Sequence, residues 1–228
     1  MTKKSNKVIT LGCSLTEQEG LANKLGELLN MQLINLAQGS GDNLLQIEKI
    51  QDFILDNDIT KDDIIVWQIT DVKRRHKNVM MDQWETVKDV QRKLYTPKDT
   101  AHFYLKRRNL IDKKRRIVLL PNSPSVQSHD FDDNASIHTI ISTMIMLNKI
   151  CKLYVWFGWD KVLSPLQFDV FFNMLITKKI AFNKKFYVNW AHDNRYNFRY
   201  DNLHPDQECA EAFAEKILYT DLKKKLKI

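Results

Sequence analysis

The chain has 228 residues, of which 43% are hydrophobic and 28% are charged. These values are typical of a globular protein with one substantial core, and they exclude a low-complexity or disordered chain. No apolar run approaches the ~20 residues that a membrane span needs, and the polar N-terminus precedes an apolar run too short for a secretory signal. We therefore expect a cytoplasmic protein without a membrane partner.

The formal net charge is +7, and part of it lies in short basic clusters such as Lys73-Arg74-Arg75 and Lys106-Arg107-Arg108. Such clusters occur in proteins that bind nucleic acids or acidic glycans, but they are more typical of a solvated charged surface. No nucleic-acid-binding fold is recognisable around them, so nucleic acid is the least favoured partner.

The cysteines and histidines are not spaced as metal ligands. Cys13, Cys151 and Cys209 lie far apart, which is typical of reduced thiols rather than of disulfides or a zinc site. The histidines share no His-x-His or His-Glu-x-x-His spacing, and no glycine-rich phosphate loop is present. We expect neither a metal nor a cofactor.

The first third of the chain alternates strand-like and helix-like patterns. Thr16 is predicted to cap the first helix, with Glu19 completing a capping box. Apolar, β-branched runs predict three strands, and leucines and isoleucines at helical spacing predict two helices between them, in the order Lys7–Cys13, Thr16–Leu29, Met31–Ala37, Asn43–Leu55 and Asp63–Thr70. This alternation is typical of a parallel sheet with right-handed crossovers, covered by helices on both faces.

The remainder begins with an insertion at about residues 71–134, where charges and aromatic residues break the pattern. We expect it to be partly helical and to contain one short apolar segment, Arg116–Leu120. Two further strands and two helices are then predicted, at Ser136–Ile150, Lys152–Trp159, Lys185–Trp190 and Pro205 to about Leu222. The prediction is a single α/β domain spanning residues 1–228, with three α/β/α layers around a five-stranded parallel sheet.

A candidate nucleophile lies directly after the first strand, in Gly12-Cys13-Ser14-Leu15-Thr16. Ligands bind outside the carboxyl ends of the strands in an open parallel sheet, so Ser14 is expected at the mouth of a site. Backbone N–H groups of the following helical turn can face a developing oxyanion there. The alternative is that Ser14 only caps the helix.

A candidate base and its partner lie after the last predicted strand, in Asp201-Asn202-Leu203-His204-Pro205. A hydroxyl needs a base to become a nucleophile, and histidine titrates near neutrality. Asp201 can accept the Nδ1 proton of His204 and fix its tautomer. Pro205 is expected at the first position of the closing helix. The alternative is an ordinary surface loop.

Together the two segments resemble the SGNH or GDSL-like hydrolases, which have a flavodoxin-like fold and a Ser-His-Asp triad. Gly12-Cys13-Ser14-Leu15-Thr16 is similar to the Gly-Cys-Ser-(Phe/Leu)-Thr variant of that family. The resemblance assigns the nucleophile to Ser14, the base to His204 and the orienting acid to Asp201. Cys13 is a rival nucleophile, disfavoured because it is expected to point into the sheet.

The resemblance also implies an oxyanion hole. Its glycine donor corresponds to Gly41, with Gly39 as second choice, in the segment Asn35–Asn43. The family's Gly-x-Asn-Asp block corresponds to Gln68-Ile69-Thr70-Asp71, so Thr70 stands where the family has an asparagine donor. The Thr70 hydroxyl or the Gln68 amide is expected to replace that donor.

The expected function is hydrolysis of an ester, with an O-acetylated carbohydrate or another acylated small molecule as substrate. Trp159 is a candidate to stack on a sugar ring, and Arg74 and Arg75 are candidates to bind an acidic group. The insertion leaves the carboxyl end of the third strand and is therefore expected to overhang the site. The alternative is a catalytically silent binding or adaptor protein, and the sequence does not define an oligomeric state.

Overall fold

The structure, a computed structural model, describes residues 6–17, 19–39, 41–70, 75–80, 115–120, 133–160, 163, 165–199 and 204–228. The chain divides into two compact units, residues Met1–Val72 with Asp132–Ile228, and Lys73–Phe131. The elements of the first unit, in chain order, are β1 (Lys7–Leu11), α1 (Ser14–Glu17), α2 (Glu19–Leu29), β2 (Gln32–Asn35), α3 (Asn43–Asp56), β3 (Ile64–Ile69), α6 (Asp133–Ile150), β6 (Lys152–Phe157), α7 (Pro165–Thr177), β7 (Ala181–Phe186), α8 (Tyr187–Asp193), α9 (Gln207–Phe213), the π-helix η3 (Ala214–Tyr219) and α10 (Thr220–Leu226).

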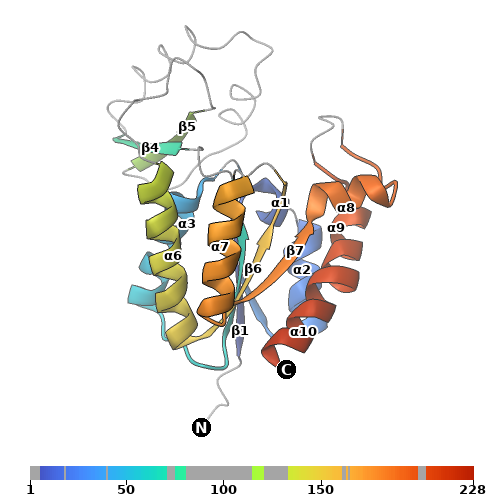
Figure 1. The fold of residues 1–228 in the computed structure, drawn as a ribbon, viewed down its shortest axis with the longest axis horizontal. Coiled ribbons are helices and arrows are strands. Elements are labelled where there is room, and N and C mark those ends of the chain that lie inside the picture. The colour runs from blue at the N-terminus through green and yellow to red at the C-terminus, as the bar shows by residue number, and fades with distance from the viewer. Residues whose placement is uncertain are drawn as a thin grey trace, which may run out of the picture. The chain divides into compact units, whose positions relative to one another are not determined.

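The first unit has a five-stranded sheet in the order β2-β1-β3-β6-β7, and all of its strand pairs are parallel (Figure 1). The predicted α/β fold with a five-stranded parallel sheet is therefore confirmed. β1 lies between β2 and β3. Because the three strands are parallel, the segments that leave their carboxyl ends emerge at the same edge of the sheet. Such an edge, at the point where the strand order reverses, is where open α/β sheets bind ligands.

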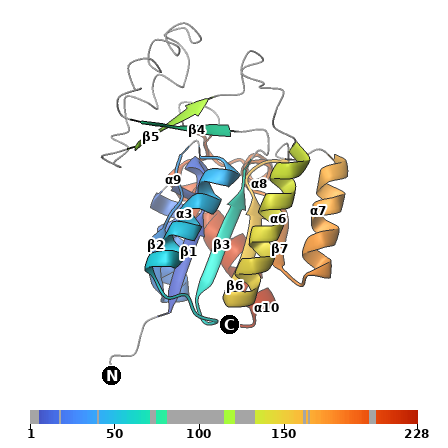
Figure 2. The same ribbon diagram turned by 90° about the vertical axis from the view of Figure 1, so that its left-hand side faces the viewer.

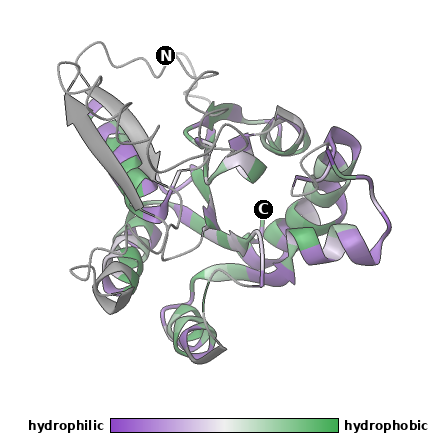
Figure 3. Ribbon diagram, turned by 90° about the horizontal axis from the view of Figure 1, so that it is seen from above, coloured by the Kyte–Doolittle hydropathy of each residue, from purple (hydrophilic) through white to green (hydrophobic). Residues whose placement is uncertain are grey.

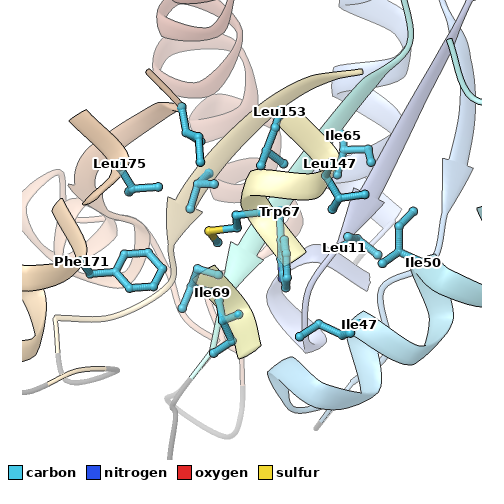
Figure 4. Packing of buried hydrophobic residues seen from close by; sticks show 14 of the residues in the cluster. Leu11, Ile47, Ile50, Ile65, Trp67, Ile69, Leu147, Leu153, Phe171 and Leu175 are labelled. Atoms are coloured by element: carbon cyan, nitrogen blue, oxygen red, sulfur yellow. The ribbon is translucent and has the colours of Figure 1, made fainter. Parts of the chain in front are cut away.

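Helices cover both faces of the sheet and form two hydrophobic cores. One core lies between the sheet and α3, α6 and α7, and the other lies between the sheet and α1, α2, α8, α9, η3 and α10 (Figures 1 and 2). Figure 4 shows Trp67 in the first core, among side chains that include Leu11, Ile47 and Leu147. Hydrophobic and hydrophilic residues alternate along the surrounding helices, as expected when one side of each helix packs on the sheet (Figure 3).

Strand β3 is buried on both faces, and its side chains alternate between the two cores. Ile65, Trp67 and Ile69 belong to the core under α3 and α6, and Val66 belongs to the core under α1 and α2. Gln68 shares the side of Val66, and it is the polar member of an otherwise apolar strand. The period-two alternation of a strand therefore places Gln68 beneath the turn that follows β1.

The prediction for the fifth strand was wrong over most of its length. The strand is Ala181–Phe186, and the residues predicted to continue it form α8. Tyr187, Val188 and Ala191 are buried, a spacing that belongs to one face of a helix. A short apolar run is compatible with either period, and here packing against the second core selects the helix.

Two predicted helix starts also differ from the structure. Thr16 does not cap the first helix, because α1 already begins at Ser14 and the Thr16 hydroxyl donates to Gln68 Oε1 at 2.7 Å. The closing helix begins at Gln207 rather than Pro205, because Asp206 is its N-cap and accepts the Cys209 N–H at 2.8 Å. In both places a tertiary contact or a neighbouring cap determines the start of the helix.

The described part of the second unit is an antiparallel strand pair, β4 (Arg75–Met80) with β5 (Arg115–Leu120). The predicted apolar segment is therefore a strand. The rest of the insertion, including the helices expected in it, lies outside the described residues. Within the described ranges, no helix is both long and apolar enough to cross a bilayer.

Candidate active site

Ser14 is the first residue of α1, at the carboxyl end of β1. The N–H groups of Thr16 and Glu17 both donate to the Cys13 carbonyl, at 3.0 and 2.9 Å, so the chain turns from strand to helix within two residues. Gly12 is required at this turn, since a Cβ there would lie 2.2 Å from the Thr16 hydroxyl oxygen. The Ser14 side chain remains partly exposed at the edge of the sheet.

His204 meets Ser14 although 190 positions separate them in the chain: Ser14 Oγ lies 2.6 Å from His204 Nε2. At this distance the hydroxyl donates to Nε2 when the imidazole is neutral with its proton on Nδ1. His204 is 8% exposed, so most of the ring is removed from bulk water. The arrangement lets the imidazole take the proton of a hydroxyl that attacks a substrate.

A short antiparallel bridge supports the backbone around His204. The Arg199 N–H donates to the His204 carbonyl at 2.8 Å, and the Asp206 N–H donates to the Asn197 carbonyl at 3.1 Å. Phe198 and Pro205 form the bridge between these two bonds. The segment is thus tied on both sides of the histidine before α9 begins. The third predicted member of the triad, Asp201, lies outside the described residues.

The neighbouring thiol points away from this pair. Cys13 is fully buried, and its Sγ lies 3.3 Å from Gln68 Nε2 inside the sheet. The Ser14 hydroxyl is 4.0 Å from the same sulfur but 2.6 Å from the imidazole. Ser14 therefore has the geometry of a nucleophile with an adjacent base, whereas Cys13 has the geometry of a core residue.

The two glycines after β2 both donate their N–H groups within the protein. Gly41 donates to the Gln38 carbonyl at 2.8 Å, and Gly39 donates to Glu17 Oε2 at 2.7 Å. The Gln38 N–H in turn donates to the Gly12 carbonyl at 3.0 Å, which joins this loop to the turn that carries Ser14. An oxyanion that used the Gly41 amide would have to compete with the carbonyl of Gln38.

Thr70 is held at the end of β3 by Asn43, the first residue of α3. The Thr70 N–H donates to Asn43 Oδ1 and the Asn43 amide donates to the Thr70 carbonyl, both at 2.9 Å. The Thr70 hydroxyl is buried and has no hydrogen-bond partner in the described structure. Its role as an oxyanion donor stays a prediction, because the hydroxyl is out of contact with solvent in this structure. Sequence reasoning missed the role of Asn43, because nothing local indicates that its amide pairs with a strand 27 positions later.

Gln68 faces the nucleophile turn from inside the sheet rather than from the substrate side. Its Oε1 accepts from the Cys13 N–H at 3.2 Å and from the Thr16 hydroxyl at 2.7 Å, while Nε2 donates to Cys13 Sγ. All three contacts lie on the buried side of the turn. This amide supports the turn and, in this conformation, is not directed to an oxyanion.

The predicted substrate-binding residues are only partly described. Trp159 follows β6, is half-buried and packs against both hydrophobic cores. Arg74 lies outside the described residues, and Arg75 begins β4 in the second unit. Among the described residues, no group of three or more His, Cys, Asp and Glu side chains is arranged to hold a metal ion.

Comparison with solved structures identifies the fold as that of the SGNH hydrolases, the group that includes the GDSL lipolytic proteins. A psychrotrophic esterase, EstA from Pseudoalteromonas sp., has a TM-score of 0.57 at 11% identity, over 98% of this chain and 100% of that one. A member of the lipolytic G-D-S-L family from Veillonella parvula has a TM-score of 0.54 at 10% identity, over 94% and 97% of the two chains. No family model matches the sequence, and no curated protein matches it significantly.

Proposed function

We propose that this chain is a serine ester hydrolase that works by acyl transfer, with Ser14 as nucleophile and His204 as general base. The observation that carries the proposal is the 2.6 Å distance between Ser14 Oγ and His204 Nε2 at the carboxyl edge of the sheet. The fold supports it, because the solved structures that share this fold include an esterase and a lipolytic protein. Asp201 would accept the Nδ1 proton of His204 and stabilise the imidazolium.

In the proposed reaction the Ser14 oxygen attacks the ester carbonyl carbon while its proton passes to His204 Nε2. The alcohol then leaves with that proton, which gives an acyl-serine and neutral His204. A water molecule, deprotonated by His204, attacks the acyl carbon, and the serine leaves with the proton. Both tetrahedral intermediates carry an oxyanion, and the proposed donors to it are the N–H of Ser14 and the Thr70 hydroxyl, with Gly41 as a further candidate.

For the substrate we propose an O-acetylated carbohydrate. Recognition of an acetyl group needs little beyond the triad and its oxyanion donors. Trp159, which is half-buried after the end of β6, is the residue that we propose to contact a sugar ring. Arg74 and Arg75 are proposed to bind an anionic group of an acidic glycan. These residues belong to the segment that the sequence predicts to overhang the site.

The first test compares wild type with Ser14→Ala on p-nitrophenyl acetate and on an acetylated oligosaccharide. We expect Ser14→Ala to lose at least about 10³-fold in kcat without a change in unfolding temperature, because the hydroxyl makes no contact that the core needs. An activated alkylphosphonate ester, such as a p-nitrophenyl alkylphosphonate, should transfer its phosphonyl group to Ser14 Oγ with release of p-nitrophenolate, since the esterase EstA is inhibited by monoethylphosphonate in one of its structures. Full activity in Ser14→Ala together with an inactive Cys13→Ala would make Cys13 the nucleophile.

The second candidate function is a catalytically silent binding or adaptor protein with this fold. Two observations favour it: the Gly41 N–H is engaged with the Gln38 carbonyl, and Thr70 stands where the family has asparagine. Loss of one oxyanion donor costs about 2.7–4 kcal/mol of transition-state stabilisation. A wild-type protein that cleaves neither ester and is not labelled by the phosphonate would support this second function.

A further inference from the structure

Gln68 is a buried polar side chain that contacts the turn carrying Ser14, on both sides of that residue. Its Oε1 accepts from the Cys13 N–H at 3.2 Å, immediately before Ser14, and from the Thr16 hydroxyl at 2.7 Å, two positions after it. Its Nε2 donates to Cys13 Sγ at 3.3 Å. The oxygen and the nitrogen of the Gln68 amide therefore both form hydrogen bonds with the turn that carries Ser14.

Two glycines leave the space that this amide fills. A Cβ on Gly12 would lie 2.6 Å from Gln68 Oε1, and a Cβ on Gly158 would lie 2.7 Å from Gln68 Nε2. The same Cβ on Gly158 would lie 2.8 Å from Leu15 Cδ1. Real Cβ atoms essentially never come within 3.0 Å of such neighbours. The ends of β1 and β6 are thus shaped around the Gln68 amide, which fixes its position.

We infer that Gln68 is a positioning residue: it holds the β1–α1 turn so that Ser14 Oγ stays within reach of His204 Nε2. This inference rests on the proposed role of Ser14 as nucleophile. It differs from an oxyanion role, because the amide N–H of Gln68 is directed to the Cys13 sulfur. It also differs from simple space filling, because the hydrogen bonds converge on the two residues that flank Ser14 and Leu15.

The physical consequence follows from what removal of the amide would leave behind. The Cys13 N–H and the Thr16 hydroxyl would then be buried without an acceptor, which costs free energy. A shift of the turn that brings these donors to other acceptors would lower that cost. A displacement of about 1 Å in a reacting group costs on the order of 10²-fold in rate. The rate of the chemical step depends on the distance between Ser14 Oγ and His204 Nε2, whereas binding of the ground-state substrate does not. We therefore expect kcat to fall while KM stays nearly constant.

The test uses Gln68→Met, which keeps the length of the side chain and removes its hydrogen bonds. Gln46→Met is the matched control, since Gln46 is 1% exposed and its amide has no hydrogen-bond partner among the residues that the structure describes. On p-nitrophenyl acetate we expect kcat to fall by about 10- to 100-fold in Gln68→Met, with KM within about twofold. Gln46→Met should keep the wild-type kcat, and labelling of Ser14 by the activated phosphonate ester should slow only in Gln68→Met.

A second readout does not depend on catalysis. Alkylation of the native protein, followed by mass spectrometry of the peptides, reports Cys13 separately from Cys151 and Cys209, which are also buried. Gln68→Met should raise the labelling rate of Cys13 relative to the other two cysteines, because the turn is released locally. Wild-type relative labelling together with an unchanged kcat would overturn the inference.

The two readouts separate the inference from the proposed function. If the wild type cleaves no ester, the proposed function fails, and relative Cys13 labelling in Gln68→Met still decides whether Gln68 holds the turn. If Gln68→Met does not fold, Thr16→Val removes one bond with little change of shape and should lower kcat about 10-fold at constant KM. An unchanged kcat and unchanged Cys13 labelling in Thr16→Val would then overturn the inference.

Discussion

Two neighbouring side chains, Cys13 and Ser14, show how a single step along the backbone changes the chemistry available at a residue. Cys13 lies in the turn after β1 and is buried in the core, whereas Ser14 begins α1 and its hydroxyl lies 2.6 Å from the imidazole of His204. The turn thus gives two consecutive side chains different environments. The more reactive group of the two, the thiol, is the one that the fold buries.

The Thr70 hydroxyl provides a prediction at this scale. Thr70→Val keeps the shape of the side chain and removes a buried hydroxyl that has no partner in the described part of the chain. If that hydroxyl donates to the oxyanion, kcat for p-nitrophenyl acetate should fall by about 10²-fold with little change in KM. The unfolding temperature should not fall, because no protein hydrogen bond is lost. A wild-type kcat in Thr70→Val would remove Thr70 from the oxyanion hole.

The reverse substitution tests the same position. Thr70→Asn restores the amide donor of the family, and it should raise kcat by up to about 10²-fold if the present donor is poor. The Asn43 pair holds the backbone of Thr70, so the change should leave the end of β3 in place. Steady-state kinetics on the same ester measure the effect, and Gln68→Met reports on the separate support of the turn. An unchanged kcat in Thr70→Asn would show that the donor at this position does not limit the reaction.

At the scale of elements, a partly buried polar cluster joins α10 to the sheet. Tyr154 of β6 donates its hydroxyl to Asp221 Oδ2 at 2.6 Å, and the Asn183 amide of β7 donates to the same oxygen at 3.2 Å. Lys225, one turn after Asp221 in α10, lies 2.9 Å from that carboxylate. Burial and the bond to Asp221 raise the pKa of Tyr154 well above its ordinary value, so the hydroxyl remains a donor. These contacts attach α10 to two strands at once.

Tyr154→Phe should therefore destabilise the protein by about 1–3 kcal/mol, because it leaves the Asp221 carboxylate without its shortest hydrogen bond. Urea unfolding measures the change. Asp221→Asn and the double variant complete a cycle in which the two effects should not add, since both act on one hydrogen bond. Additive effects would show that the two residues stabilise α10 independently.

At the scale of the whole molecule, two buried thiols outside the site, those of Cys151 and Cys209, make the free energy of unfolding depend on pH in the alkaline range. Burial raises the pKa of Cys151 and of Cys209 from the ordinary value of 9.0 to about 12. Between these values the unfolded chain loses the protons that the folded chain keeps. Stability from these thiols is thus fully present below pH 9 and declines as the pH rises toward 12.

The free energy of unfolding should fall by about 1.4 kcal/mol per pH unit for each of the two thiols above their unfolded pKa. Urea titrations at several pH values between 8 and 10.5 would measure this slope, a range set by the shift from 9.0 to about 12. Replacing Cys151 and Cys209 by alanine should flatten the slope, even if the core loses some stability at every pH. An equal slope in wild type and in the double variant would show that these thiols ionise as readily in the folded protein as in the unfolded chain.

The proposed substrate also gives a prediction for the basic segment Lys73-Arg74-Arg75. Replacing all three residues with glutamine should raise KM for an acidic acetylated glycan and leave p-nitrophenyl acetate nearly unaffected. The KM difference should shrink with added salt, since exposed charges are screened beyond about 10 Å at 0.1 M. Equal losses on both substrates would make the segment structural, and no loss on either would assign it to a solvated surface.

Local patterns in the sequence were sufficient to predict the fold class and to indicate Ser14 and His204 as candidate site residues. Parallel buried strands are continuous apolar runs, and a parallel sheet gathers the residues after its strands at one edge, so local patterns were sufficient. The positions of these segments along the chain therefore predicted that Ser14 and His204 would lie close together. The distance between Ser14 Oγ and His204 Nε2 is 2.6 Å.

Features that depend on partners distant in the chain could not be predicted from local patterns and became apparent in the folded structure. Thr16 lies inside α1 because Gln68, 52 positions later, accepts its hydroxyl, and Tyr187 begins a helix because the second core takes one helical face. The engagement of the Gly41 amide and the pairing of Asn43 with Thr70 are likewise invisible in the local sequence. Propensity and periodicity are local, whereas a hydrogen-bond partner or a packing face is chosen by whichever strand or helix the fold places beside it.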